Sequence, residues 1–358
     1  MKKFISIALC IILAVSLMPV TLAADYGDFE YQANSVGTYV ITGYNNFKND
    51  YVTIPETING IKVTAVGKAA FQNKTNVTTV KFPESVTAIA ANAFYGCKNL
   101  SSVLLTDSIT SIGSKAFSMC TSLTGINLRN VTTVGEHAFY GCNNITNLYC
   151  GDSLKVIGAY AFQKCSALTF IKWSPKLIYI GNYAFADCTS LTSLTLPNKL
   201  NHIGNSSFKN CTALKTLKFG TGKLEIGAYA FENCSALTSV TLPNNISSIG
   251  RHAFSLRAQG STSFSNSVSL SCTSKTSAAV KYAKIHNVPI YIGEYNKTYS
   301  CFGDLNGNGK TEKTDAKSVL RIAASMDKSI SGDKLFVCDI NCNGKIDTGD
   351  VSYILQNA

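Results

Sequence analysis

The sequence predicts a mainly β solenoid of about nine coils of 23 residues, followed by a small α-helical module. The first observation behind this prediction is a phenylalanine that returns every 23 residues, with a single interval of 22. The repeated residues are Phe71, Phe94, Phe117, Phe139, Phe162, Phe185, Phe208, Phe231 and Phe254. A unit of this length forms one coil, which cannot bury its apolar face alone and has to stack on its neighbours.

The second observation is an apolar alternation between the phenylalanines, as in Leu191, Leu194 and Leu196. Successive side chains of a strand point to opposite faces. The leucines of this L-x-x-L-x-L motif therefore face inward, and the Thr and Ser residues between them face water. We expect one short strand in each coil, joined by stacking into one long parallel sheet.

Glycines and cysteines add two more columns to the predicted stack. Gly181 and its equivalents are expected to carry the backbone through a tight turn that a Cβ atom would obstruct, and Ala90 replaces this glycine in one coil. Seven cysteines follow the repeated phenylalanine by three residues, namely Cys97, Cys120, Cys142, Cys165, Cys188, Cys211 and Cys234. Stacking places them in one buried column, which favours inert core thiols over disulfides or metal ligands.

The two ends of the chain differ from the repeats. Residues 1–24 combine Lys2 and Lys3 with an apolar run and small residues at Ala23 and Ala24, which is typical of a secretory signal peptide. The run is short for a membrane span, so we expect a secreted protein. Residues 25–63 are assigned to an N-terminal cap and residues 64–257 to the repeats. A C-terminal cap (258–292) with a helix over 276–286, a linker (293–302) and a module (303–358) follow.

The formal net charge is +11, which includes Lys2 and Lys3. A basic surface can attract acidic polysaccharide, cell-wall polymer or nucleic acid. The lysines are scattered along the sequence rather than clustered, so the favoured interpretation is an ordinary solvated surface. No nucleic acid partner is expected.

The phrase from Ile180 to Cys188 recurs in register with the pairs Leu196-Pro197 and Leu242-Pro243. In this respect residues 30–292 resemble the BspA-like class of bacterial leucine-rich repeats. The resemblance implies a leucine-rich-repeat solenoid, and it implies adhesion or protein binding as the role of the repeats.

Two related loops follow the predicted linker, 35 residues apart. Each has oxygen side chains at positions 1, 3 and 5, glycine at position 6 and a carboxylate at position 12, which is the pattern of a calcium loop. The expected ligands are Asp304, Asn306, Asn308, Lys310, Glu312 and Asp315 in the first loop, and Asp339, Asn341, Asn343, Lys345, Asp347 and Asp350 in the second. The two lysines would contribute backbone carbonyls. We therefore predict two bound Ca²⁺ ions.

Each loop precedes an apolar helical run, over 316–326 and 351–355, without the entering helix of an ordinary EF-hand. This duplicated loop and helix resembles the type I dockerin, a calcium-binding module that docks onto a cohesin of a cellulosomal scaffoldin. The resemblance implies cohesin contacts at Lys313, Thr314, Leu320 and Arg321 in the first copy and Thr348, Gly349, Leu355 and Gln356 in the second. The two copies differ from each other and depart from the commoner Ser/Thr pair.

Outward strand positions are the candidates for a ligand surface on the repeats. Tyr149, Phe170 and Lys172 are expected to lie near each other on neighbouring coils, where exposed rings beside a cation suit a sugar ring or a protein partner. An ordinary β surface is the simpler interpretation. A second row consists of His137, Tyr160, Tyr183, Tyr229 and His252. A binding ridge is one interpretation of this row, and packing at the coil edges is the favoured one.

Catalytic motifs are missing from the sequence, which contains no nucleophile elbow, zinc-binding H-E-x-x-H or phosphate loop. Together with what the two resemblances imply, this predicts a non-catalytic, secreted cellulosomal protein whose repeats bind a protein or glycan. Two alternatives stay open: a dockerin-borne polysaccharide-processing enzyme with an unrecognised site, and a cell-surface adhesin anchored through a cohesin.

Overall fold

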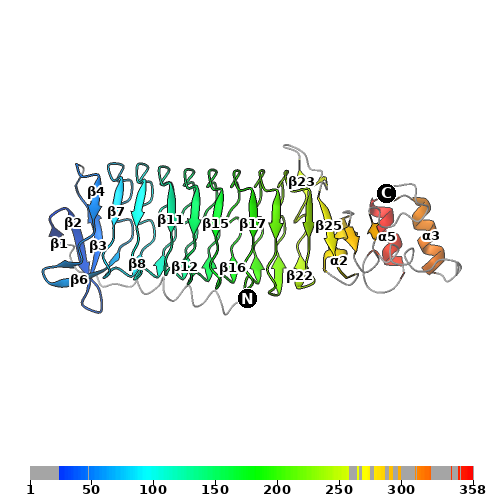
Figure 1. The fold of residues 1–358 in the computed structure, drawn as a ribbon, viewed down its shortest axis with the longest axis horizontal. Coiled ribbons are helices and arrows are strands. Elements are labelled where there is room, and N and C mark those ends of the chain that lie inside the picture. The colour runs from blue at the N-terminus through cyan, green and yellow to red at the C-terminus, as the bar shows by residue number, and fades with distance from the viewer. Residues whose placement is uncertain are drawn as a thin grey trace.

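The fold is a row of stacked coils with a helical module at its C-terminal end (Figure 1). The computed structural model describes residues 24–46, 48–257, 264–265, 268–274, 278–286, 290–292, 297–299, 311, 313–323, 340, 346 and 348–357. Residues 1–23 of the predicted signal peptide lie outside the described residues. No helix in the described part of the chain is long and apolar enough to cross a membrane.

A small antiparallel sheet covers the N-terminal end of the stack, as the predicted cap requires. It consists of β1 (Ala24–Tyr26), β2 (Phe29–Ala33) and β3 (Tyr39–Tyr44), and β3 then pairs in parallel with β6 (Ile61–Val66). The short strand β5 (Thr57–Ile58) pairs with β6 in the antiparallel direction. The ring of Tyr44 stacks on Phe71 at 5.0 Å, so the cap closes the first coil of the core.

Each coil contributes two strands rather than the single strand that we predicted. The strands of the L-x-x-L-x-L motif are β4 (Tyr51–Thr53), β7 (Thr79–Lys81), β9 (Ser102–Leu104), β11 (Gly125–Asn127), β13 (Asn147–Tyr149), β15 (Phe170–Lys172), β17 (Ser193–Thr195), β19 (Thr216–Lys218) and β21 (Ser239–Thr241). The second set is β8 (Ala88–Ile89), β10 (Ser111–Ile112), β12 (Thr133–Val134), β14 (Val156–Ile157), β16 (Tyr179–Ile180), β18 (His202–Ile203), β20 (Leu224–Ile226) and β22 (Ile246–Ile249).

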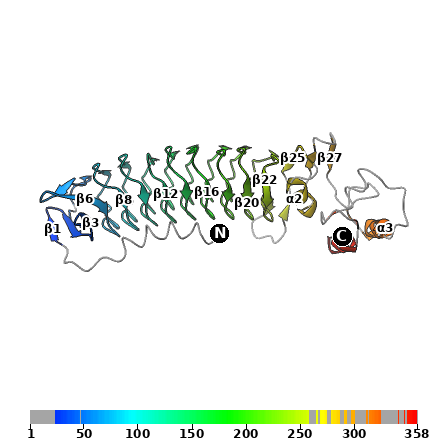
Figure 2. The same ribbon diagram turned by 90° about the horizontal axis from the view of Figure 1, so that it is seen from below.

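The long parallel sheet is made by the second set, so the prediction was wrong about which strands form it. This sheet runs from β6 through β8 to β22, whereas the motif strands form shorter sheets such as β4-β7-β9 and β11-β13-β15. Figure 2 shows the same stack of coils from below. Most of the second strands have only two residues, which is too short for an alternation to be recognised in the sequence.

The repeated phenylalanines form one continuous column inside the stack. Each is at most 2% exposed, and successive ring centroids are 4.8 to 5.4 Å apart. Burial of each side chain stabilises the fold by about 2 kcal/mol, and the near-parallel ring pairs add to this. The predicted core column is therefore confirmed.

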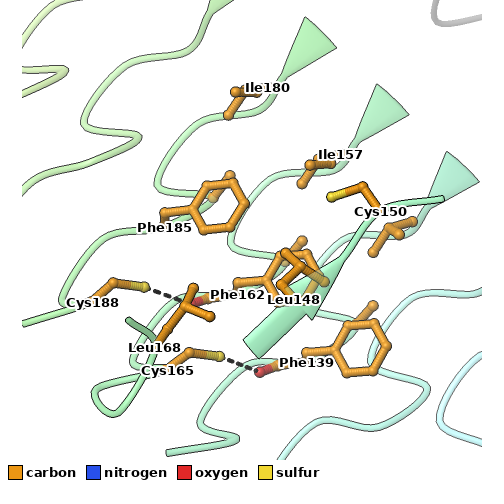
Figure 3. Packing of buried hydrophobic residues seen from close by; sticks show 14 of the residues in the cluster. Phe139, Leu148, Cys150, Ile157, Phe162, Cys165, Leu168, Ile180, Phe185 and Cys188 are labelled. Atoms are coloured by element: carbon orange, nitrogen blue, oxygen red, sulfur yellow. Dashed lines mark hydrogen bonds between the residues drawn. The ribbon is translucent and has the colours of Figure 1, made fainter. Parts of the chain in front are cut away.

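The seven predicted core cysteines are free and buried. Each thiol also donates a hydrogen bond to the carbonyl of a phenylalanine in the preceding coil, at Sγ to O distances of 2.9 to 3.4 Å. Figure 3 shows two of these bonds, from Cys165 to Phe139 and from Cys188 to Phe162. The thiols thus link successive coils in addition to filling the core.

The turn glycines are needed because of close stacking between coils. A Cβ atom on Gly158 would lie 2.8 Å from the backbone nitrogen of Glu136 in the coil before it. The left-handed backbone conformation falls two residues later, at non-glycine residues such as Tyr160 (φ 59°) and Tyr183 (φ 56°). The predicted obstruction is therefore correct, but the neighbouring coil causes it rather than a positive φ at the glycine.

The C-terminal end of the stack contains β23 (Leu256–Arg257), β24 (Phe264–Ser265), β25 (Ser269–Cys272), β26 (Ile290–Ile292) and the helix α2 (Ala278–His286). The helix was predicted, and the Tyr282 ring on it meets the edge of Phe254, the last ring of the column, at 5.9 Å. The strand β27 (Lys297–Tyr299) pairs with β26, so the segment predicted as a linker contains a strand. The helices α3 (Lys313–Ala323) and α5 (Thr348–Asn357) follow, each beginning three residues before its predicted start.

Candidate binding surface

The outward side chains of β7, β9, β11, β13, β15, β17, β19 and β21 form a face that we call the leucine-motif face. Their registers place equivalent residues of neighbouring coils side by side, as Tyr149 opposite Lys172 and Thr195 opposite Lys218. Threonines just before the strands bond along the stack: Thr146 Oγ1 donates to the carbonyl of Thr124 at 3.2 Å. The face is therefore fixed by the same repeat that builds the core.

The three predicted ligand-surface residues meet on this face. The rings of Tyr149 and Phe170 are 5.9 Å apart, with planes tilted by 58°. They are 42% and 47% exposed, and the exposed Lys172 lies directly across from Tyr149. Two open rings beside a cation form a surface that can stack on a flat ligand.

A second feature of the same face was not predicted. Lys215, Lys218, Phe219, Thr241 and Pro243 help to line a shallow depression of about 500 Å³ between β19 and β21. The depression lies two coils further along the stack than Lys172. Lys215 and Lys218 belong to one coil, and the register aligns Lys218 with Lys172 two coils away. The expectation of scattered lysines therefore does not describe this face.

The second aromatic row is half-buried and stacked. Tyr160 lies 4.5 Å from His137 and 5.0 Å from Tyr183, measured between ring centroids, with nearly parallel planes. Burial lowers the pKa of His137, although the carboxylate of Glu136, 3.5 Å from Nδ1, acts in the opposite direction. This packing is consistent with the interpretation of the row as a coil edge.

The long sheet carries another aromatic pair that the sequence analysis did not single out. The ring of Tyr179 stacks on His202 at 4.8 Å, and His202 Nδ1 lies 3.6 Å from a carboxylate oxygen of Glu225. These residues occupy one register position in β16, β18 and β20. These residues are neighbours because the second set of strands pairs in register, and the sequence analysis did not predict those strands.

Near the C-terminal end of the stack, a serine and a histidine lie close to each other. Ser255 Oγ is 3.5 Å from His252 Nδ1. Ser255 is also only 1% exposed, so a substrate has no access to its hydroxyl. Within the described ranges, no group of three or more His, Cys, Asp or Glu residues is placed to hold a metal ion.

The C-terminal module has a small core of its own, formed by Ala316 and Val319 of α3, Val351 and Ile354 of α5, and Ile340. Asp315 and Asp350 stand at equivalent places in the first turns of α3 and α5, 1% and 0% exposed. Asp350 Oδ1 accepts a hydrogen bond from the backbone N–H of Ile340 at 2.8 Å. The sequence pattern therefore found two structurally equivalent buried carboxylates.

Asp315 and Asp350 are the two predicted calcium ligands among the described residues. Asp304, Asn306, Asn308, Lys310, Glu312, Asp339, Asn341, Asn343, Lys345 and Asp347 lie outside the described residues. Of the predicted cohesin contacts, Lys313, Thr314, Leu320, Thr348, Gly349 and Leu355 are exposed on α3 and α5. Arg321 and Gln356 belong to the same helices, and their side chains lie outside the described set.

The geometry defines a class of protein: a solenoid of stacked leucine-rich coils with an open sheet face. Residues 41–169 and 155–274 match the family described as the BspA type leucine rich repeat region. The chain therefore belongs to this family, as the repeat phrase indicated. The matched segments end at residue 274, before α3 and α5. No curated protein sequence matches the chain.

Several solved structures of leucine-rich repeat proteins are similar to this chain. A leucine rich cell surface protein from Faecalibacterium prausnitzii A2-165 is 27% identical, with a TM-score of 0.54, over 66% of this chain and 74% of that chain. A leucine rich repeat protein from T. pallidum is also 27% identical, with a TM-score of 0.46, over 60% and 90% of the two chains. A leucine-rich repeat protein from Bacteroides ovatus is 24% identical, with a TM-score of 0.40, over 71% and 85%.

Proposed function

We propose that the chain is a secreted, non-catalytic binding protein. Its leucine-motif face binds a protein or glycan ligand, and its C-terminal module is a calcium-dependent dockerin that attaches it to a cohesin of a scaffoldin. The observation that carries the first part is the exposed pair Tyr149 and Phe170 beside Lys172. The cell-surface description of the Faecalibacterium relative supports a role in recognition or adhesion outside the cell.

The exposed ring pair has little role in folding, so its role in binding can be tested by mutation. Tyr149 and Phe170 point away from the core. The core is instead filled by inward residues such as Leu148, which precedes Tyr149 on β13 and is fully buried. Replacing both rings by alanine should therefore leave the fold intact and remove contact area that a ligand would use.

The test of the repeat face compares two variants of the full chain on an array of glycans and extracellular proteins. Tyr149→Ala/Phe170→Ala should no longer bind the array ligands that the wild-type chain binds. Tyr179→Ala, which removes an exposed ring from the long sheet, should bind those ligands as the wild type does. Equal binding by the double variant and the wild type would reject the leucine-motif face as the ligand surface.

The proposal for the module rests on Asp315 and Asp350. Calcium takes carboxylate oxygens as ligands, and both carboxylates are buried where a loop meets its helix. The carboxylates lie at the last position of the two predicted loops, at the start of helices that pack on each other. Bound calcium would supply positive charge at this point and hold each loop against its helix.

The partner of the module is proposed to be a cohesin, which would contact the exposed residues Lys313, Thr314, Leu320, Thr348 and Leu355. Calorimetric titration of the full chain with a panel of cohesins, first with calcium and then with chelator, tests this proposal. Binding should require calcium, and Asp315→Asn/Asp350→Asn should abolish it. Undiminished binding in excess chelator would reject a calcium-dependent dockerin.

A free cell-surface adhesin is the second candidate, and the description of the Faecalibacterium relative favours it. In that case no cohesin binds, and the chain adheres to whole cells or host polymers through the repeats alone. The same titration separates the two functions, because only the first requires the module.

A further inference from the structure

The charge of the leucine-motif face and its flanking turns is unevenly distributed along the stack. In four consecutive coils, residues 166–178, 189–201, 212–224 and 235–246 contain six lysines and no Asp or Glu, a charge of +6. In the four preceding coils, the equivalent residues 75–87, 98–110, 121–132 and 143–155 contain four bases and three acids, a charge of +1. The excess is therefore confined to the C-terminal half of the face.

The six residues, which we call the lysine patch, are Lys172, Lys176, Lys199, Lys215, Lys218 and Lys223. All six are exposed, and none forms an ion pair with another described residue. Lys176, Lys199 and Lys223 occupy the same turn after the motif strand in three successive coils. A line of unpaired cations at one side of the face therefore runs beside the cations on the strands.

The spacing of these cations follows from the stack. Lys172 and Lys218 occupy the same register position two coils apart, which corresponds to about 10 Å at the usual strand separation. Lys215 and Lys218 flank the depression of about 500 Å³. Beside the lysines lie the exposed hydroxyls of residues such as Thr195, Thr216 and Thr241, which can both donate and accept hydrogen bonds.

We propose that the ligand of this face is an anionic polysaccharide, whose acidic groups lie along the lysine patch and whose sugar rings stack on Tyr149 and Phe170. This inference rests on the proposed binding role of the leucine-motif face and specifies its ligand. Repeating charges on an extended chain match cations that recur from coil to coil. Hydroxyl-rich strands and two open rings suit sugars, which combine hydroxyl groups with flat apolar faces.

Other polyanions match the face less well. Lysine is depleted in the cores of protein–protein interfaces, whereas this patch carries six lysines. Nucleic acid binding commonly uses arginine, whose planar guanidinium also stacks on bases, and the three segments that carry the lysine patch contain no arginine. An anionic glycan needs neither an apolar interface core nor arginine stacked on bases.

The test measures binding of the full chain to polygalacturonate and to its fully methyl-esterified form, which keeps the rings and removes the charges. The patch variant is Lys172→Gln/Lys215→Gln/Lys218→Gln. The matched control, Lys81→Gln/Lys98→Gln/Lys155→Gln, removes the same charge from exposed lysines of the N-terminal coils. Thermal unfolding confirms that both variants are folded.

The wild-type chain should bind polygalacturonate, bind the ester at least tenfold more weakly, and lose affinity as salt screens the charges. The patch variant should lose about tenfold in affinity and the control less than twofold. Equal binding of the acid and the ester, or equal losses in both variants, would overturn the inference. Binding of a single-stranded oligonucleotide as tightly as polygalacturonate would assign the patch to polyanions in general and also overturn it.

The ring variant Tyr149→Ala/Phe170→Ala separates this inference from the proposed function. If it loses binding while acid and ester bind alike, the leucine-motif face is a binding surface for neutral ligands and only the anionic assignment fails. If it binds every probe as the wild type does, the proposed function of the face fails as well.

Discussion

The buried thiols of the repeats, which are the seven column cysteines together with Cys150 outside that column, predict unfolding at alkaline pH. Burial raises the pKa of Cys97, Cys142 and Cys150 from 9.0 to about 12. In the unfolded chain these thiols ionise near their ordinary pKa, whereas the folded chain keeps their protons. Their contribution to stability is therefore fully present below about pH 9 and is lost as the pH rises toward about 12.

The size of this effect follows from proton linkage. Each thiol reduces the free energy of unfolding by about 1.4 kcal/mol per pH unit in this window, so three thiols reduce it by about 4 kcal/mol per pH unit. Folded domains are typically stable by about 5–15 kcal/mol. Across the window from about pH 9 to about pH 12 the three thiols remove about 12 kcal/mol in all, which is enough to unfold a domain of ordinary stability.

The assay is urea unfolding followed by circular dichroism between about pH 8 and pH 11, in the presence of a reductant. Lysines and tyrosines also titrate in this range, so the wild type is compared with Cys142→Ala/Cys150→Ala, in which those groups are unchanged. The variant is less stable at neutral pH, but its loss of stability should be shallower by about 2.8 kcal/mol per pH unit. Identical pH slopes in the two proteins would refute the reasoning.

Three other results are expected. Gly158→Ala should destabilise the stack by about 1–3 kcal/mol in urea unfolding, because its Cβ would lie 2.8 Å from the backbone of the preceding coil, whereas Ala90→Gly should change little. Phe162→Ala should cost about 3–5 kcal/mol, because the ring is fully buried between two others, and the exposed Phe170→Ala should stay within about 0.5 kcal/mol of the wild type. Chelation of calcium should remove the melting transition of α3 and α5 in calorimetry and leave that of the repeats unchanged.

The core of this fold is predictable because its signal repeats. Phe162 and Cys165 each recur at an interval of about 23 residues, and stacking converts that interval into a column. The long sheet was not predictable, because pairs such as Tyr179–Ile180 are too short to show an alternation. The left-handed conformation of Tyr183 gave no signal either, because glycine is the usual marker of that conformation and it lies two residues earlier.

The same contrast applies to the candidate site. Tyr149, Phe170 and Lys172 could be predicted as neighbours because they occupy adjacent positions in consecutive coils. The depression beside Lys215 and Lys218 could not be predicted, because its shape depends on the packing of β19, Phe219 and β21 against one another. The lysine patch is not apparent from the net charge of the whole chain. It becomes apparent only when the residues that each coil contributes to the leucine-motif face are compared.

The lysine patch is not required by the fold. Lys172, Thr195 and Asn127 occupy equivalent outward positions above the same kind of inward residue, so a coil stacks equally well with a neutral side chain there. Like charges on neighbouring coils repel each other and slightly destabilise the stack. Folding alone would therefore favour the mixed charges of the N-terminal coils. A negatively charged ligand explains the difference in charge between the N-terminal and C-terminal coils better than the architecture does.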